Sequence, residues 1–197
     1  MASLYRNGGK RLADVLAAAV LLLLLAPLIA LLLIANALYW RGQPLFRQQR
    51  LGYQAQPFAL LKLRSMHPGP GEDAARTPAW GRFLRRTHLD ELPQLLHILL
   101  GQMSFIGPRP LLPHYLPHYS PEEATRHRVR PGLTGWAQVH PHETTWPTRL
   151  ARDAAYAQGL SLAWDARILV LTVRHLLGGQ GSPSMPPLTP PPSGPDS

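Results

Sequence analysis

Two adjacent carboxylates, Asp90 and Glu91, stand in a segment that is otherwise basic and has helical periodicity. Thr87 has the position of an N-cap, Asp90 follows it by three residues as in a capping box, and leucines then recur at helical spacing. The pair would lie in the first turn of a helix over 88–100, where free N–H groups and the helix dipole stabilise negative charge and also attract phosphate. Simple capping by the acidic residues is the competing interpretation.

Cations that could bind phosphate oxygens lie on both sides of this pair in the sequence. Lys62 and Arg64 alternate within a predicted strand over 58–66 and would share one face of it. Arg109 lies between two prolines, which stiffen its loop and reduce the entropy lost when the side chain binds an anion. Solvated lysines and arginines are the alternative in both places.

The elements that must position these side chains are mostly helical. We predict helices at 79–86, 88–100, 121–130, 146–158 and 164–177. A loop rich in proline and glycine is expected at 67–78. Residues 131–139 predict a turn that feeds a short strand, with two glycines that let the backbone approach a ligand closely.

Composition limits the partners of this chain. Its 197 residues carry 20 Lys and Arg against 11 Asp and Glu, a net charge of +9. Such a basic chain favours phosphate in nucleic acid, anionic lipid or phosphorylated small molecules. Aromatic residues make up only 8% of the chain, which weakens the hypothesis that it binds single-stranded nucleic acid by stacking bases on aromatic rings. Cysteine is absent, which excludes disulfides and thiolate metal sites.

An uncharged apolar run covers residues 15–35 and is long enough to cross a bilayer. It is too long for the core of a signal peptide and lacks a clear cleavage site. Pro27 should kink the helix. Basic residues flank both ends, and they favour the cytoplasmic side. A re-entrant helix that bends and returns satisfies both flanks, although the residues alone leave the spanning and re-entrant forms equally open.

The chain is therefore expected to be α+β, mostly helical, in three regions. Residues 1–40 would form a basic segment and a membrane helix, residues 41–178 a small α/β catalytic domain, and residues 179–197 a disordered proline-rich tail.

Many of these features occur together, in the same order, in one known family. Over about residues 9–177 the chain resembles the small monotopic phosphoglycosyl transferases, bacterial sugar transferases that prime polysaccharide and glycan assembly. The matching segments are Lys10-Arg11, Asp14, Ala26-Pro27, Gln49-Arg50-Leu51-Gly52, Lys62-Leu63-Arg64-Ser65-Met66, Arg85-Arg86-Thr87-His88-Leu89-Asp90-Glu91-Leu92-Pro93-Gln94, Gly107-Pro108-Arg109-Pro110, Arg130-Pro131-Gly132-Leu133-Thr134-Gly135-Trp136-Ala137-Gln138, Asp153 and Tyr156.

The chain also departs from the usual family residues. His88, His97 and Gln102 stand where Ser, Asn and Asp are usual, and residues 140–142 are His-Pro-His in place of Gly-Arg-Asn. These departures bear on substrate preference. They also keep open a second hypothesis, an impaired relative that serves as a membrane-anchored scaffold for glycan-assembly enzymes.

The resemblance implies a reaction. Family members transfer a phosphosugar from a UDP-sugar to polyprenol (undecaprenyl) phosphate and release UMP. Carried over by position, Asp90 would be the nucleophile that forms a covalent phosphosugar enzyme, and Glu91 would bind Mg²⁺ with Asp90 or assist proton handling.

The resemblance also implies a substrate site and a location. Asp153 would have a structural or uridine-binding role, and the turn containing Thr134 and Gly135 would offer backbone donors to phosphate. The candidate phosphate-binding cations are Lys62, Arg64, Arg85, Arg109, Arg126 and Arg128. The enzyme would sit at the cytoplasmic face of the bacterial inner membrane on a re-entrant helix and amphipathic interfacial helices, without nucleic acid. The sequence does not identify which sugar is transferred, which pathway the product enters or what the oligomeric state is.

Overall fold

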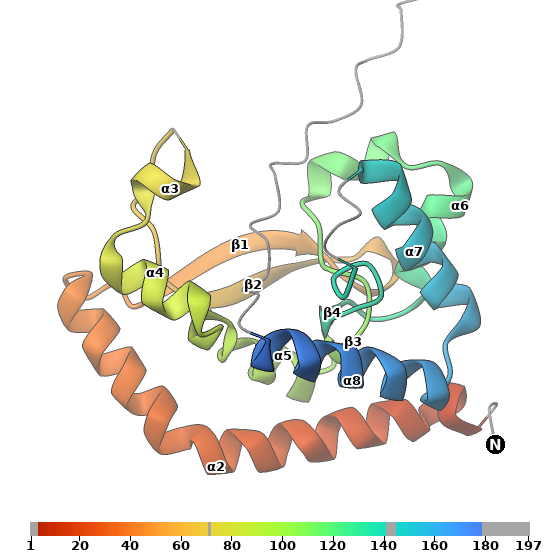
Figure 1. Cartoon of the computed structure of the whole chain (residues 1–197), viewed down its shortest axis with the longest axis horizontal. Helices are drawn as coiled ribbons and strands as arrows, with labels where there is room; N and C mark the ends of the chain where they lie inside the picture. Colours follow the sequence, from red (N-terminus) through yellow and green to blue (C-terminus); the bar gives the residue numbers. More distant parts are fainter. Residues whose placement is uncertain (1–3, 71, 141–144, 179–197) are drawn as a thin grey trace, which may run out of the picture.

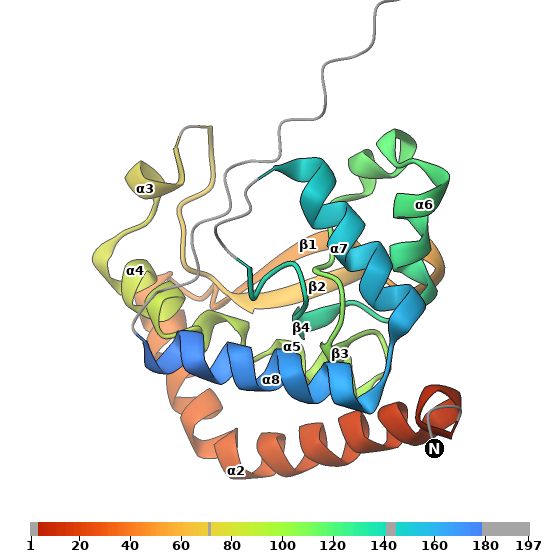
Figure 2. The same ribbon diagram turned by 45° about the vertical axis from the view of Figure 1, so that its right-hand side comes forward.

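One long helix, α2 (Lys10–Tyr39), runs along one edge of the molecule (Figures 1 and 2). The strands and the helices that follow α2 form a folded body on one side of this helix. The computed structural model describes residues 4–70, 72–140 and 145–178. The predicted tail at 179–197 lies outside the described residues. The helix is long and apolar enough to cross a membrane by length and composition.

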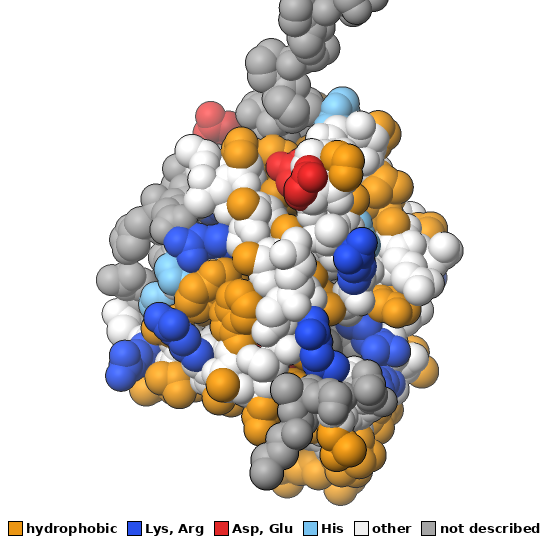
Figure 3. Space-filling view, turned by 90° about the vertical axis from the view of Figure 1, so that its right-hand side faces the viewer, with side chains coloured by type: hydrophobic (Ala, Val, Ile, Leu, Met, Phe, Trp, Pro, Cys, Tyr) orange, Lys and Arg blue, Asp and Glu red, His pale blue; other side chains and the backbone are white. Residues whose placement is uncertain are grey.

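The helix changes direction about midway along its length (Figure 1). Pro27 lies within it, and a proline cannot donate the hydrogen bond that the preceding turn requires. Most of the leucines of this helix are exposed; Leu23 and Leu38 are each 79% exposed. Figure 3 shows the hydrophobic side chains gathered at the level of α2, with Lys and Arg side chains above them.

Both ends of α2 are attached to the same folded body. Near its start, Lys10 donates a hydrogen bond of 2.7 Å to the buried carboxylate of Asp165. Near its end, the amide of Asn36 donates to the carbonyl of Pro44 at 2.6 Å and accepts from the indole of Trp80 at 2.8 Å. The residues at the two ends of the apolar run are therefore held against the same folded body.

A hairpin of strands β1 (Leu45–Leu51) and β2 (Pro57–Leu63) covers the middle of the body. The two strands pair antiparallel through a short turn, η2 (Tyr53–Ala55). This confirms the predicted strand at 58–66 in its first part only, because β2 ends before Arg64. A second, parallel pair joins β3 (Ser104–Ile106) to β4 (Gly132–Thr134).

Short helices connect and cover these strands. They are η1 (Tyr5–Gly9), α3 (Asp73–Arg76), α4 (Ala79–Arg86), η3 (Leu89–Glu91), α5 (Gln94–Leu99), η4 (Pro113–His118), α6 (Pro121–Ala124), η5 (Thr125–Arg128), α7 (Trp146–Gly159) and α8 (Leu162–Leu177). The predicted helices at 79–86, 146–158 and 164–177 are confirmed. The prediction of a helix at 121–130 is confirmed in part. The α-helix begins with a capping box between Ser120 and Glu123, but from Thr125 it continues as the 3₁₀ helix η5. The loop predicted at 67–78 contains α3.

The predicted helix over 88–100 is only partly confirmed, and its N-cap at Thr87 is wrong. Thr87 instead ends α4, where its hydroxyl donates to the carbonyl of Phe83 at 2.8 Å. His88 then adopts a left-handed backbone, with φ of 56°. The threonine hydroxyl bonds backward to the preceding turn rather than forward to free N–H groups, so a new 3₁₀ turn starts at residue 89 and α5 only at Gln94.

The prediction for residues 131–139 also needs correction. The strand β4 comes first and the turn follows it. A Cβ on Gly132 would lie 2.1 Å from the amide nitrogen of Gly107, and one on Gly135 would lie 2.1 Å from the carbonyl oxygen of Gly107. The absent side chains thus let two backbone segments of the protein pack together, which is not the approach to a ligand expected from the sequence.

Apolar packing joins α2 to the body. Ala18 of α2 is fully buried against a cluster that includes Phe58 of β2, Leu95 and Ile98 of α5, and Met103. The face of α8 opposite its buried Ile168 is apolar and exposed, like most of α2. The molecule thus presents two apolar helical surfaces to its surroundings, as an interfacial protein does.

Candidate active site

The Asp90–Glu91 pair lies in the tight 3₁₀ turn η3, between α4 and α5. The flanking residues Leu89 and Leu92 pack against a buried cluster that includes Leu84 of α4. The left-handed residue before the turn and the packed leucines on either side direct the two carboxylates toward β2. A short turn fixed at both ends therefore holds both acidic groups.

Glu91 is bound by cations from two distant segments. One of its carboxylate oxygens, Oε1, accepts a 2.5 Å hydrogen bond from Lys62 of β2 and lies 3.5 Å from the guanidinium of Arg109. Burial raises the pKa of Glu91, but the charges of Lys62 and Arg109 outweigh it and lower the pKa to about 2. Glu91 is therefore ionised at neutral pH. The structure brings Lys62 and Arg109, two of the predicted phosphate ligands, into contact with Glu91.

Asp90 differs from its neighbour. It is buried, at 6% exposure, and within the described parts of the chain its carboxylate has no hydrogen bond or ion pair. Burial raises the pKa of Asp90, Lys62 opposes the shift and the charge of Glu91 adds to it. The result is a carboxylate that is more basic than usual and is not occupied by a protein cation, two properties that suit a nucleophile.

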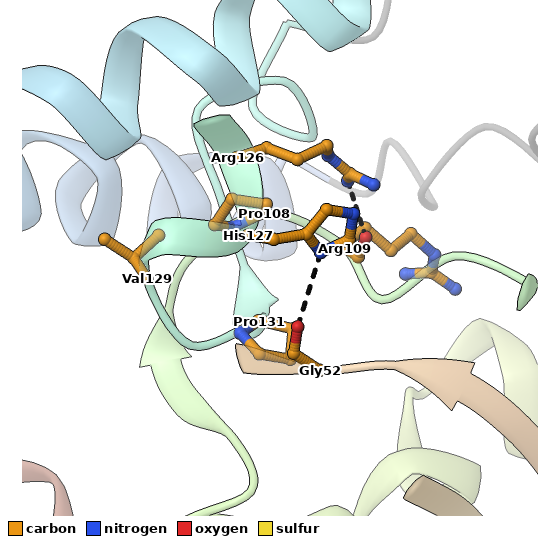
Figure 4. Close-up of a pocket in the computed structure, with 7 residues that line it drawn as sticks. All are labelled: Gly52, Pro108, Arg109, Arg126, His127, Val129 and Pro131. Carbon is orange, nitrogen blue, oxygen red and sulfur yellow. Dashed lines mark hydrogen bonds between the residues drawn. The ribbon is translucent and has the colours of Figure 1, made fainter. Parts of the chain in front are cut away.

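The loop that carries Arg109 is held by the buried side chain of Arg126, whose hydrogen bond to this loop is drawn in Figure 4. Arg126, only 2% exposed, donates to the Arg109 carbonyl at 2.7 Å and to the carboxylate of Asp153 at 2.6 Å. In Figure 4 the side chain of Arg109 extends away from Arg126 and His127. Arg126 and Asp153 thus fix the backbone from which Arg109 reaches Glu91.

The other predicted ligands lie outside this immediate cluster. Arg64 stacks on the ring of Trp40, with 5.9 Å from Cζ to the ring centroid. Arg85 lies near Met66 and is 3.5 Å from Asp73, although its charge also lowers the pKa of Asp90. The remaining three also lie elsewhere, and Gly135 packs against the backbone of Gly107. Arg128 is exposed beside the η2 turn, and the hydroxyl of Thr134 bonds to that of Thr172 at 2.7 Å.

One cation near the site was absent from the predicted ligands. Arg50 of β1 donates to the carbonyl of Pro110 at 3.2 Å and to the side chain of Gln48 at 2.6 Å. Burial and the charge of Arg109 lower the pKa of Arg50 to about 10, and the charge of Glu91 acts in the opposite direction. Its place in the Gln49-Arg50-Leu51-Gly52 motif was the sequence signal that could have identified it.

Asp90 and Glu91 can be compared with the ligands that Mg²⁺ usually takes. Within the described residues no group of three or more His, Asp or Glu side chains forms a metal cage. Mg²⁺ commonly binds one or two carboxylates and completes its shell with substrate phosphates and water. The unoccupied carboxylate of Asp90 and the second oxygen of Glu91 fit a site of that kind.

A comparison of the sequence with known protein families identifies the family of this chain. The model of the bacterial sugar transferase family matches residues 5–179. The chain belongs to the bacterial sugar transferases. This confirms the resemblance found in the sequence and makes the protein an enzyme of the phosphoglycosyl transferase class.

Three relatives show how far the similarity extends. The sugar transferase is 42% identical over 180 residues to the uncharacterized sugar transferase EpsL of Bacillus subtilis, covering 87% of this chain and 89% of the relative. It is 44% identical to the UDP-glucose:undecaprenyl-phosphate glucose-1-phosphate transferase of Caulobacter vibrioides, covering 85% and 69%. It is 34% identical to the exopolysaccharide production protein ExoY of Rhizobium meliloti, covering 88% and 87%.

Proposed function

We propose that this sugar transferase moves a phosphosugar from a UDP-sugar to polyprenol (undecaprenyl) phosphate and releases UMP, as the first membrane step of exopolysaccharide, O-antigen or glycan synthesis. Relatives named for the transfer of glucose 1-phosphate to undecaprenyl phosphate support the substrate classes. The observation that carries the proposal is the contrast within one turn, where Glu91 is bound by two cations and the adjacent Asp90 is left without a partner among the described residues.

In the first step, a carboxylate oxygen of Asp90 attacks the β-phosphorus of the nucleotide sugar. The bond between that phosphorus and the bridging oxygen breaks, and UMP leaves with the oxygen. The raised pKa of Asp90 makes its carboxylate a stronger nucleophile, while the nearby charge of Lys62 opposes that rise. Arg109 can hold phosphate oxygens in a bidentate grip and offset the repulsion between anions.

In the second step, a phosphate oxygen of the polyprenol phosphate attacks the phosphorus of the acyl phosphate. The bond to Asp90 breaks, polyprenyl diphosphosugar forms, and the carboxylate is regenerated. Bound Mg²⁺ would supply charge neutralisation at the diphosphate. In the protein without substrate, Lys62 and Arg109 lower the pKa of Glu91 to about 2, so this carboxylate is ionised when the substrate arrives.

The acceptor is a lipid, so the site must lie at the membrane surface. The two ends of α2 bind one folded body, while the middle of the helix is apolar and exposed. These contacts support a re-entrant helix that bends at Pro27 with both ends on the cytoplasmic side of the inner membrane, and they oppose a spanning form.

Topology can be tested cleanly because the chain has no cysteine. Single cysteines at Ser3 and Gln43 should react with an impermeant thiol reagent from the same side of sealed inverted vesicles. Labelling of the two positions from opposite sides would exclude the re-entrant form.

The reaction is tested by trapping the intermediate. Purified protein incubated with a UDP-sugar panel and Mg²⁺, without acceptor, should gain the mass of one phosphosugar at Asp90. Asp90→Asn should abolish both the adduct and UMP release. Turnover that continues with no adduct at residue 90 would contradict the covalent mechanism, and no UMP with any nucleotide sugar would favour the scaffold hypothesis.

A further inference from the structure

A buried histidine lies beside the active site and uses both of its ring nitrogens. His97 of α5 is only 4% exposed. Its Nε2 lies 3.0 Å from the backbone N–H of Leu61, and its Nδ1 lies 2.6 Å from the side-chain oxygen of Gln102. Because an amide oxygen can only accept, Nδ1 carries the proton and Nε2 accepts from Leu61. Gln102 thus selects the tautomer that the strand requires.

This contact joins the two segments that make the active site. Leu61 directly precedes Lys62 on β2, and the side chain of Lys62 bonds to Glu91. His97 belongs to the helix that begins three residues after Glu91. In the described sheet, β2 pairs with β1 on one edge only, so His97 satisfies a backbone N–H on its other edge.

We propose that His97, oriented by Gln102, is a positioning residue that sets the distance between the ammonium of Lys62 and the Asp90–Glu91 turn. This inference rests on the proposed transferase function. Loss of the bond leaves a buried N–H unsatisfied and lets β2 move relative to the turn. A displacement of about 1 Å at a reacting centre can reduce a rate by up to roughly 100-fold. His97 and Gln102 accordingly act as one pair.

The test replaces the histidine by a ring of similar shape. His97→Phe keeps an aromatic ring beside Phe58, whose centroid lies 5.4 Å away, but removes both nitrogens. We expect kcat for UMP release to fall roughly 10-fold or more, with KM for the UDP-sugar changed by less than about 3-fold, because the lost alignment matters most in the transition state. The matched control is His118→Phe, at an exposed position away from the site, which should retain wild-type kcat.

Two further variants separate positioning from a general loss of packing. His97→Gln can place an acceptor near Leu61 and should recover part of the lost rate. Gln102→Leu removes the group that fixes the tautomer and should lower kcat in the same direction as His97→Phe; it also serves if His97→Phe does not fold.

A double-mutant cycle gives the decisive result. If His97 acts through Lys62, His97→Phe should have little additional effect on kcat once Lys62 is replaced by Met, because the group being positioned is gone. Losses that multiply in the double variant, or unchanged kcat in both His97→Phe and Gln102→Leu, would overturn the proposal.

Hydrogen exchange provides a readout without turnover. The amide of Leu61 should exchange faster in His97→Phe than in the wild type, while the amides of α7 keep their protection. Unchanged exchange at Leu61 would refute the connection between α5 and β2. A wild-type protein that releases no UMP would instead refute the transferase function, and the exchange result would still decide this inference.

Discussion

Two ion pairs in this protein have similar chemistry but different surroundings. Arg126 and Asp153 lie 2.6 Å apart with side chains only 1% and 6% exposed. Lys62 and Glu91 are each 19% exposed, and Glu91 is also shared with Arg109. The first pair is sealed and supports the backbone of the Arg109 loop. The second is more exposed, and we propose that its cations exchange the carboxylate for a substrate phosphate. Accessibility therefore separates the pair that holds the fold from the pair that can act on a ligand.

Breaking the sealed pair should have the largest effect on stability. Arg126→Met leaves the buried carboxylate of Asp153 without its partner and removes the bond to the Arg109 carbonyl. We expect a loss of roughly 3–5 kcal/mol in the free energy of unfolding. Thermal or denaturant unfolding in detergent measures it, and Arg126→Lys should lose less. A fully stable Arg126→Met would show that the pair does not hold the loop.

Breaking the open pair should mainly affect catalysis. Lys62→Met removes a cation that we propose binds the reacting phosphate, and we expect kcat to fall roughly 100-fold or more. Stability should fall by only about 1 kcal/mol, since a partly exposed pair contributes little. UMP release and thermal unfolding measured on the same samples check both parts. Large destabilisation with normal turnover would reverse the roles assigned to the two pairs.

The open pair should also stabilise the protein in a defined pH range. The folded-state pKa of Glu91, about 2, lies below the value of about 4.3 expected in an unfolded chain. Folding therefore favours the ionised form, and the stabilisation is complete above about pH 4.3 and is lost as the pH falls toward 2. Glu91→Gln should lose less stability than the wild type over this range. Equal acid sensitivity of both proteins in unfolding titrations would contradict the shift.

The smallest effect should come from a predicted ligand that the structure places elsewhere. Arg64 lies over the ring of Trp40 beyond the end of β2. Arg64→Gln should change kcat and KM by no more than about 2-fold, as for surface substitutions away from a site. A loss comparable to that of Lys62→Met would mean that Arg64 moves to the substrate on binding.

The sequence by itself determined what depends on local order. An uncharged apolar run specified α2, Pro147 in the first turn indicated α7, and periodic apolar residues specified α8. The motif around Asp90 identified the family and the acidic pair. Each of these signals lies within neighbouring residues and needs no knowledge of distant segments.

Only the tertiary structure decided how those parts meet. Local pattern could not show that the Thr87 hydroxyl bonds backward, because both directions satisfy the same preference. It could not choose between the partners of Glu91, which come from a strand 29 residues earlier and a loop after it. It also left the two forms of α2 open, and the contacts of Lys10 and Asn36, which join both ends to one body, support the re-entrant form that we propose. Which charges remain accessible follows from this long-range packing, and accessibility separates the site from its support.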